Sequence, residues 1–142
     1  MGQIDFHTGV NDKSAYACRL VRKAYASGQK IVLYWSDLAA LQALDQLLWS
    51  FSAIDFLPHV FSHDSLASVT PILLTHTETD TAHSQLLINL DQQIPAFFSR
   101  FARTIELVSD DPLDAAAGRA RYKLYQAQGH TLSHHIIGAP PS

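Results

Sequence analysis

Residues 30–35 (KIVLYW) limit the folds that are open to this chain. The run is almost continuously apolar, β-branched or aromatic, which is typical of a central strand covered on both faces. A strand at 3–7 and a helix from 11–12 to 27 precede it, and Ser36 or Asp37 can cap a helix from 38 to about 49. This order of strands and helices favours a parallel sheet with helices on its faces.

The rest of the chain continues the alternation. Residues 71–75, 85–90 and 104–108 are predicted strands, and Pro95 opens a helix before the last of them. A final helix over 110–129 has Asp110 or Asp111 as its cap and Gly129 as its stop. We therefore predict an α/β fold: one Rossmann-like domain at 1–132, with a mostly parallel sheet of about five strands and helices on both faces. Residues 133–142 are predicted to be a flexible tail.

The final helix has two predicted faces. Its buried stripe is expected to be apolar, with Leu113, Ala116, Ala117, Ala120 and Leu124. Arg119, Tyr122 and Lys123 stand at i, i+3 and i+4, so their side chains share an exposed face. Such a face either is simply solvated or binds an acidic, aromatic or carboxylate-ended peptide.

Residues 47–63 form a second notable segment. They are rich in aromatic and aliphatic side chains without a regular period, and Pro58 interrupts any helix across them. A loop of this composition either packs onto the core or forms an exposed patch for a partner.

The charges are unevenly distributed along the 142 residues. All ten Lys and Arg lie within 13–30 or 100–123, whereas 31–99 carries seven acidic residues, and the net charge is −3. This balance argues against broad binding to a DNA backbone but permits a small basic pocket. The single cysteine, Cys18, is expected to be a packing residue in a reducing compartment, which we take to be the cytoplasm. No apolar run approaches the ~20 residues of a membrane span.

Motifs for catalysis or cofactor binding are absent from the sequence. The turn at 7–11 has one glycine, so it lacks the dinucleotide fingerprint, and neither a P-loop nor a nucleophile elbow occurs. The pairs His59/His63 and His134/His135 do not make a metal site of a known pattern, so we expect no metal and no cofactor. Two other functions remain open. One is a small nucleotide-binding protein or enzyme, and the other is direct DNA binding by Arg19, Arg22 and Lys23.

Three sequence blocks occur together. They are Gly28-x-Lys30, then Leu44-x-x-x-Leu48-Trp49 with Phe56-Leu57-Pro58-His59, and finally Arg119-x-x-Tyr122-Lys123-x-Tyr125-x-x-x-Gly129. In this order and spacing they resemble the chi subunit family of bacterial DNA polymerase III, from the first strand to Leu132. The resemblance implies a non-catalytic domain that links the clamp loader, through the psi subunit, to single-stranded DNA-binding protein.

The resemblance also implies two binding surfaces. The family residues that bind the acidic C-terminal tail of single-stranded DNA-binding protein match Val108, Arg119, Tyr122 and Lys123. That tail ends in aspartates, an apolar residue, a proline and a terminal phenylalanine, so cations would hold carboxylates while Tyr122 and Val108 flank the ring. The family residues that bind psi, where that subunit is present, match Trp49, Phe56 and Pro58.

One position departs from the family pattern. Some relatives carry a lysine one turn before the arginine, where this chain has Ala115, preceded by the acidic Asp114. We therefore expect a weaker or shifted tail site, with Arg103 or Arg121 as candidates to compensate.

Overall fold

Strand β2 (Ile31–Tyr34) lies in the interior of the sheet, as its apolar composition predicts. All four of its residues are buried, and it pairs in parallel with β4 (Ile72–Thr75) and β5 (Leu86–Asn89). The computed structural model describes residues 2–51, 56–78 and 81–137.

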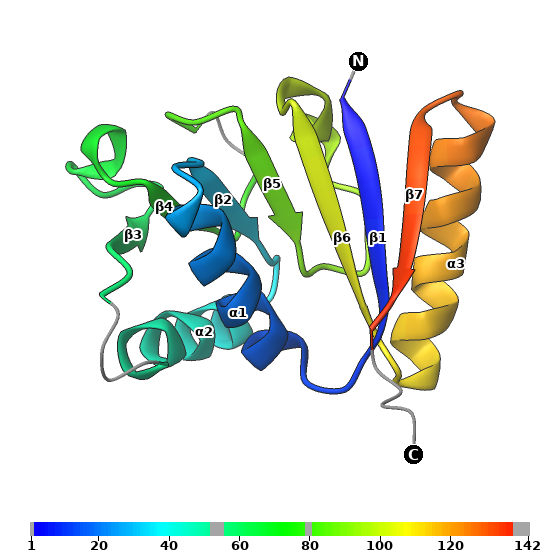
Figure 1. Cartoon of the computed structure of the whole chain (residues 1–142), viewed down its shortest axis with the longest axis horizontal. Coiled ribbons are helices and arrows are strands. Elements are labelled where there is room, and N and C mark those ends of the chain that lie inside the picture. The colour runs from blue at the N-terminus through cyan, green and yellow to red at the C-terminus, as the bar shows by residue number, and fades with distance from the viewer. Residues whose placement is uncertain (1, 52–55, 79–80, 138–142) are drawn as a thin grey trace.

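In the described part of the chain, seven strands form one sheet in the order β3-β4-β2-β5-β6-β1-β7. The other four are β1 (Gln3–Val10), β3 (His59–Phe61), β6 (Arg103–Ser109) and β7 (Thr131–Ile136). Every described pairing is parallel, so the carboxyl ends of the strands lie along the same edge, the lower edge in Figure 1.

Helices cover both faces of the sheet. Helices α1 (Lys13–Ala26) and α2 (Leu38–Ser50) pack on one face, and α3 (Pro112–Ala127) packs on the other (Figure 1). Two short 3₁₀ helices, η1 (Ala67–Val69) and η2 (Ala96–Arg100), also contribute to the second face. Each face of the sheet has its own hydrophobic core, and successive residues of β2 contribute to opposite cores. Ile31 and Leu33 pack with α1 and α2, whereas Val32 and Tyr34 pack with η1 and η2.

An aspartate caps the amino end of each α-helix. The carboxylates of Asp12 and Asp37 accept hydrogen bonds of 3.1 Å from the backbone N–H groups of Ala15 and Ala40. The Asp111 carboxylate accepts one of 2.9 Å from Leu113 N–H. These caps confirm the predicted helix starts, and they occupy helix N-termini that other α/β proteins leave open for phosphate groups.

The prediction of about five strands missed β3 and β7. Strand β3 has only three residues, and the apolar composition of 47–63 hides it. Residues 133–136 of strand β7 were predicted to belong to a flexible tail, but the whole of β7, residues 131–136, pairs with β1. This edge strand is mostly exposed, so it has no hydrophobic alternation to reveal it. Residues 52–55 of the apolar segment and 138–142 of the tail lie outside the described residues.

Candidate functional site

A cavity of about 440 Å³ opens between α3 and the carboxyl ends of β1, β6 and β7. We call it the α3 pocket. Phe6, Val108 and Gly118 contribute its apolar interior, and one flank of α3 forms a wall with Ala115, Arg119, Tyr122 and Lys123. The remaining lining residues are Thr8, Gly9, Ser109, Asp110 and His134.

The four residues predicted for tail binding all line this pocket. Val108 is buried, and the half-buried Tyr122 packs edge-on against Phe6 with ring centroids 5.1 Å apart. Arg119 and Lys123 are exposed, and neither side chain has an ion pair or hydrogen bond among the described residues. The arrangement is therefore an apolar pocket with two cations at its mouth, which suits a ligand that carries a ring and carboxylates.

The predicted buried stripe of α3 is wrong. Leu113 and Leu124 are 78% and 54% exposed, whereas the residues that face the sheet are Asp114, Gly118, Arg121 and Tyr125. The face of α3 that meets the sheet combines Tyr125, which packs in an apolar cluster with Phe6 and Val108, with polar side chains that have partners on α1 and β6. Sequence periodicity counts apolar residues and cannot detect such partners.

Glu106 on β6 is the centre of those polar contacts. Arg121 Nε donates to its carboxylate at 2.9 Å and Tyr125 OH at 2.6 Å, while Asn89 Nδ2 donates to both oxygens. Burial raises the pKa of Glu106, and the Arg121 charge and these donors counteract part of that rise. Burial, followed by the adjacent Glu106 charge, also raises the pKa of Tyr125. The network anchors the middle of α3 to the sheet.

Gly118 allows α3 to approach β6 closely. A Cβ atom at this position would lie 2.7 Å from both methyl carbons of Val108, closer than carbon atoms pack. The same two residues line the α3 pocket, so this close approach defines part of its shape. The sequence analysis missed Gly118, although a glycine inside a helical pattern is a signal of close packing.

Neither arginine proposed to compensate for Ala115 reaches the pocket. Arg103 pairs with the buried Asp5, with Nη2 and Nε at 2.5 and 2.6 Å from Oδ2, and Arg121 is held by Glu106. Ala115 itself lines the pocket. His134, which the sequence analysis considered only as a metal ligand, lines it from β7.

The predicted psi-binding residues form a second surface at the other end of the sheet. Trp49 and Phe56 are 50% and 67% exposed, and their ring centroids lie 5.7 Å apart, with the half-buried Pro58 two residues after Phe56. The buried His59 ring lies 4.1 Å from the Trp49 ring, and its nitrogens contact Leu57 O at 2.5 Å and Asp45 O at 3.1 Å. His59 is therefore a structural support of this aromatic patch rather than a metal ligand.

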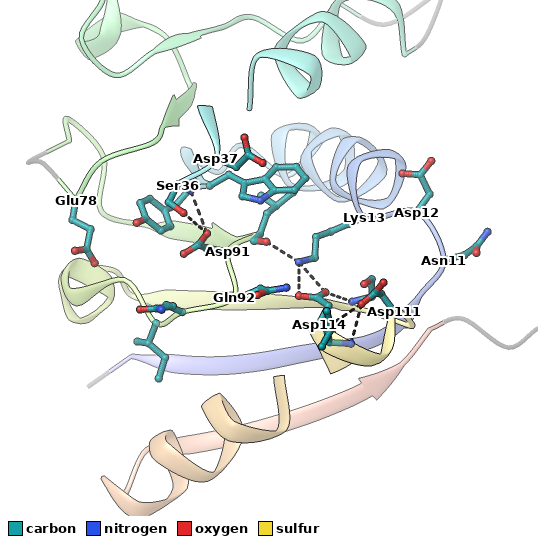
Figure 2. Close-up of a pocket in the computed structure, with 17 residues that line it drawn as sticks. Asn11, Asp12, Lys13, Ser36, Asp37, Glu78, Asp91, Gln92, Asp111 and Asp114 are labelled. Carbon is teal, nitrogen blue, oxygen red and sulfur yellow. Dashed lines mark hydrogen bonds and ion pairs between the residues drawn. The ribbon is translucent and has the colours of Figure 1, made fainter. Parts of the chain in front are cut away.

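A larger cavity lies where α/β folds usually bind nucleotides, at the carboxyl ends of the central strands (Figure 2). Six of its lining residues are acidic: Asp12, Asp37, Glu78, Asp91, Asp111 and Asp114. Lys13 is the one cation among the described lining residues, and its ammonium pairs with Asp114 Oδ2 at 2.9 Å (Figure 2). Carboxylates at these helix N-termini repel phosphate, so the cavity does not favour a nucleotide.

Within the described ranges, no group of three or more His, Cys, Asp or Glu side chains is placed to hold a metal ion. Burial raises the pKa of the Cys18 thiol to about 11, as suits a packing residue. No helix in the described part of the chain is long and apolar enough to cross a membrane.

The sheet topology places the chain among Rossmann-like α/β domains, and its sequence has neither a P-loop nor the dinucleotide-binding glycine pattern. A solved structure, titled Mss116p DEAD-box helicase domain 2 bound to an RNA duplex, shares this fold with a TM-score of 0.66. At 13% identity the likeness, which covers all of this chain and 65% of that one, concerns the fold alone.

Residues 1–133 match the family described as DNA polymerase III chi subunit, HolC, and the chain belongs to that family. Two relatives named DNA polymerase III subunit chi support this. The one from Pseudomonas aeruginosa is 35% identical over 96% of this chain and 98% of its own length. The one from Haemophilus influenzae is 32% identical, over 86% and 85% respectively. The resemblance stated from the sequence is therefore confirmed.

Proposed function

We propose that this protein is a non-catalytic adaptor of the DNA polymerase III holoenzyme with two binding surfaces. The α3 pocket binds the acidic C-terminal tail of single-stranded DNA-binding protein, and the Trp49–Phe56 patch binds a psi subunit and so connects to the clamp loader. Family membership supports the replisome assignment. The observation that carries the tail site is that Arg119 and Lys123, which have no side-chain partner in the described part of the chain, lie beside an aromatic ring at one apolar cavity.

The chemistry of the pocket fits such a tail. Arg119 offers forked donors and Lys123 a compact charge, so each can bind a carboxylate. The cavity interior offers Tyr122 and Val108 to a terminal aromatic ring. Removing one charge-assisted hydrogen bond costs ~1.5–3 kcal/mol, which corresponds to about a tenfold to hundredfold loss of affinity.

Fluorescence anisotropy tests the tail site. A labelled acidic peptide ending in Ile-Pro-Phe with a free carboxylate is titrated with the protein at low and high salt. We expect binding that weakens with salt and is lost when the carboxylate is amidated. The affinity should fall about tenfold to hundredfold in Arg119→Ala and in Lys123→Ala. Lys30→Ala, an exposed cation at the opposite edge of the sheet, is the matched control and should bind normally. Unchanged binding in both site variants would exclude the α3 pocket.

The geometry also supports simultaneous binding of both partners. The Trp49–Phe56 patch adjoins β3 and the α3 pocket adjoins β7, and these are the two outermost strands of the sheet. Ligands at opposite ends of a rigid sheet do not compete, so a variant at one surface should leave the other unchanged.

Size-exclusion chromatography with purified psi tests the second surface. Exposed aromatic anchors contribute ~2 kcal/mol or more to an interface, so Phe56→Ser should weaken the complex about thirtyfold or more. Leu66→Ser, which removes a similarly exposed apolar side chain outside the patch, is the control. If both variants form the complex as the parent does, psi binds elsewhere.

The nucleotide-binding alternative is disfavoured by the acidic cavity of Figure 2. Direct DNA binding through α1 is also disfavoured. Arg19 stacks over the Tyr16 ring of its own helix at 5.6 Å. That ring is therefore covered by a side chain and does not offer a free face on which a base could stack.

A further inference from the structure

The wall of the α3 pocket opposite the helix includes a histidine on β7. His134 lines the cavity together with Arg119, Tyr122 and Lys123, and its ring centroid lies 6.2 Å from that of Tyr122. Its Nε2 is 2.7 Å from Thr8 Oγ1 on β1, while Nδ1 has no partner among the described residues. The imidazole is therefore held at one nitrogen and open at the other.

The register of the sheet explains why this histidine, and not its neighbour, faces the pocket. β7 pairs in parallel with β1, with His134 opposite Phe6 and His135 opposite His7. Phe6 lies in the core beneath α3, whereas His7 and His135 contact each other on the opposite face, with ring centroids 5.2 Å apart. Adjacent strand residues point to opposite faces, so the two histidines form a matched pair for experiments.

We propose that His134 is a further binding residue of the α3 pocket, which in its protonated form provides a third cation for the carboxylates of an acidic peptide. This inference rests on the proposed tail-binding function. It assigns a role to a residue on β7, away from the helix that carries the other two cations. It also gives the pocket a charge that increases as the pH falls.

The surroundings of His134 are compatible with both of its protonation states. The Thr8 hydroxyl can accept from Nε2–H or donate to the bare nitrogen, so neither state leaves that nitrogen unpartnered. The charged groups that line the same pocket are Arg119 and Lys123 on α3 and Asp110 at the end of β6. The Tyr122 phenol on α3 is the other titratable group that lines this pocket beside His134.

His134 lies in the same pocket as Ala115, the position at which some relatives carry a lysine. Both residues line the cavity, one from β7 and the other from α3. Histidine is the side chain that changes charge between pH 5 and 8, so it supplies a conditional cation where a lysine at position 115 would be permanent. Affinity for an acidic peptide should therefore depend on pH in this protein.

The pH dependence of peptide binding tests the proposal. Affinity for the labelled peptide ending in Ile-Pro-Phe is measured at pH 7.5 and 5.5, at constant ionic strength, for the parent, His134→Gln and His135→Gln. The parent should bind about two- to fivefold more tightly at pH 5.5, the gain expected from one exposed ion pair. His134→Gln, whose amide nitrogen can still reach Thr8, should lose this gain, and His135→Gln should keep it.

A permanent charge provides the second variant. His134→Lys should bind the peptide more tightly than the parent at pH 7.5 and show little change at pH 5.5. If the parent binds in an Arg119-dependent way but His134→Gln retains the full pH effect, this inference is wrong and the proposed function stands. If the peptide does not bind at either pH, or binds independently of Arg119, the proposed function itself fails.

Discussion

Replacing Arg121 by methionine should destabilise the protein far more than replacing its neighbour Arg119. Arg121 is 2% exposed, and its Nε lies 2.9 Å from an oxygen of Glu106, which is fully buried. Methionine fills much of the same volume but cannot neutralise that carboxylate or donate to Gln92 O, which Arg121 Nη1 contacts at 2.8 Å. Breaking a buried ion pair in this way costs ~3–5 kcal/mol.

The loss should depend on pH, with a sign that follows from Glu106. Burial already raises the pKa of Glu106, and removing the Arg121 charge raises it further. The folded variant then binds a proton that the unfolded chain has released, so its stability increases as the pH falls from neutral toward the ordinary glutamate range. Each unit of pKa difference corresponds to about 1.36 kcal/mol, so the deficit relative to the parent should be largest near pH 8 and shrink toward pH 5.

Urea unfolding followed by tryptophan fluorescence measures the effect. The free energy of unfolding is compared at pH 8 and 5 for the parent, Arg121→Met and Arg119→Met. Arg119 is exposed on the same helix, so its replacement should change stability by no more than about 0.5 kcal/mol. A deficit of less than about 1 kcal/mol for Arg121→Met at pH 8, or one that does not change with pH, would refute the assignment of a buried ion pair.

Three further predictions address the helix packing, the acidic cavity and the fold's usual ligand. Gly118→Ala should destabilise the protein by ~1–2 kcal/mol despite a better helix propensity, because its Cβ would meet Val108, and Val108→Ala in the same chain should recover part of the loss in urea unfolding. Lys13→Met should cost ~1.5–3 kcal/mol near pH 7. Burial favours the neutral form of Asp114, but hydrogen bonds from Ser109 N–H and Lys13 outweigh burial and lower the pKa of Asp114. The parent therefore loses the stabilisation from ionised Asp114 only below pH ~4. In an acid titration, Lys13→Met should unfold at a higher pH than the parent. ATP and NAD should not raise the melting temperature, whereas a ligand at a hundred times its dissociation constant would stabilise the protein by ~2.7 kcal/mol.

Much of the fold follows from local sequence signals. The apolar run at 30–35 predicted β2, and aspartates before amphipathic segments predicted the helix starts, because strand burial and helix capping depend on near neighbours in the chain. The resemblance carried by the three sequence blocks together added the family, which the comparison with known proteins confirms. Helical spacing alone places Arg119, Tyr122 and Lys123 on one face of α3, whereas the packing of α3 against β6 brings Val108 to the same pocket.

Only the tertiary structure decided which side of α3 faces the sheet. The apolar pattern selected Leu113 and Leu124, but the buried side chains are Asp114 and Arg121, whose partners Lys13 on α1 and Glu106 on β6 are 101 and 15 residues away. It also decided that residues 131–136 are a strand, because the pairing partner β1 is at the other end of the chain. That pairing places His134 beside α3, so a pocket residue that no local pattern indicates depends on a contact between the two ends of the sequence.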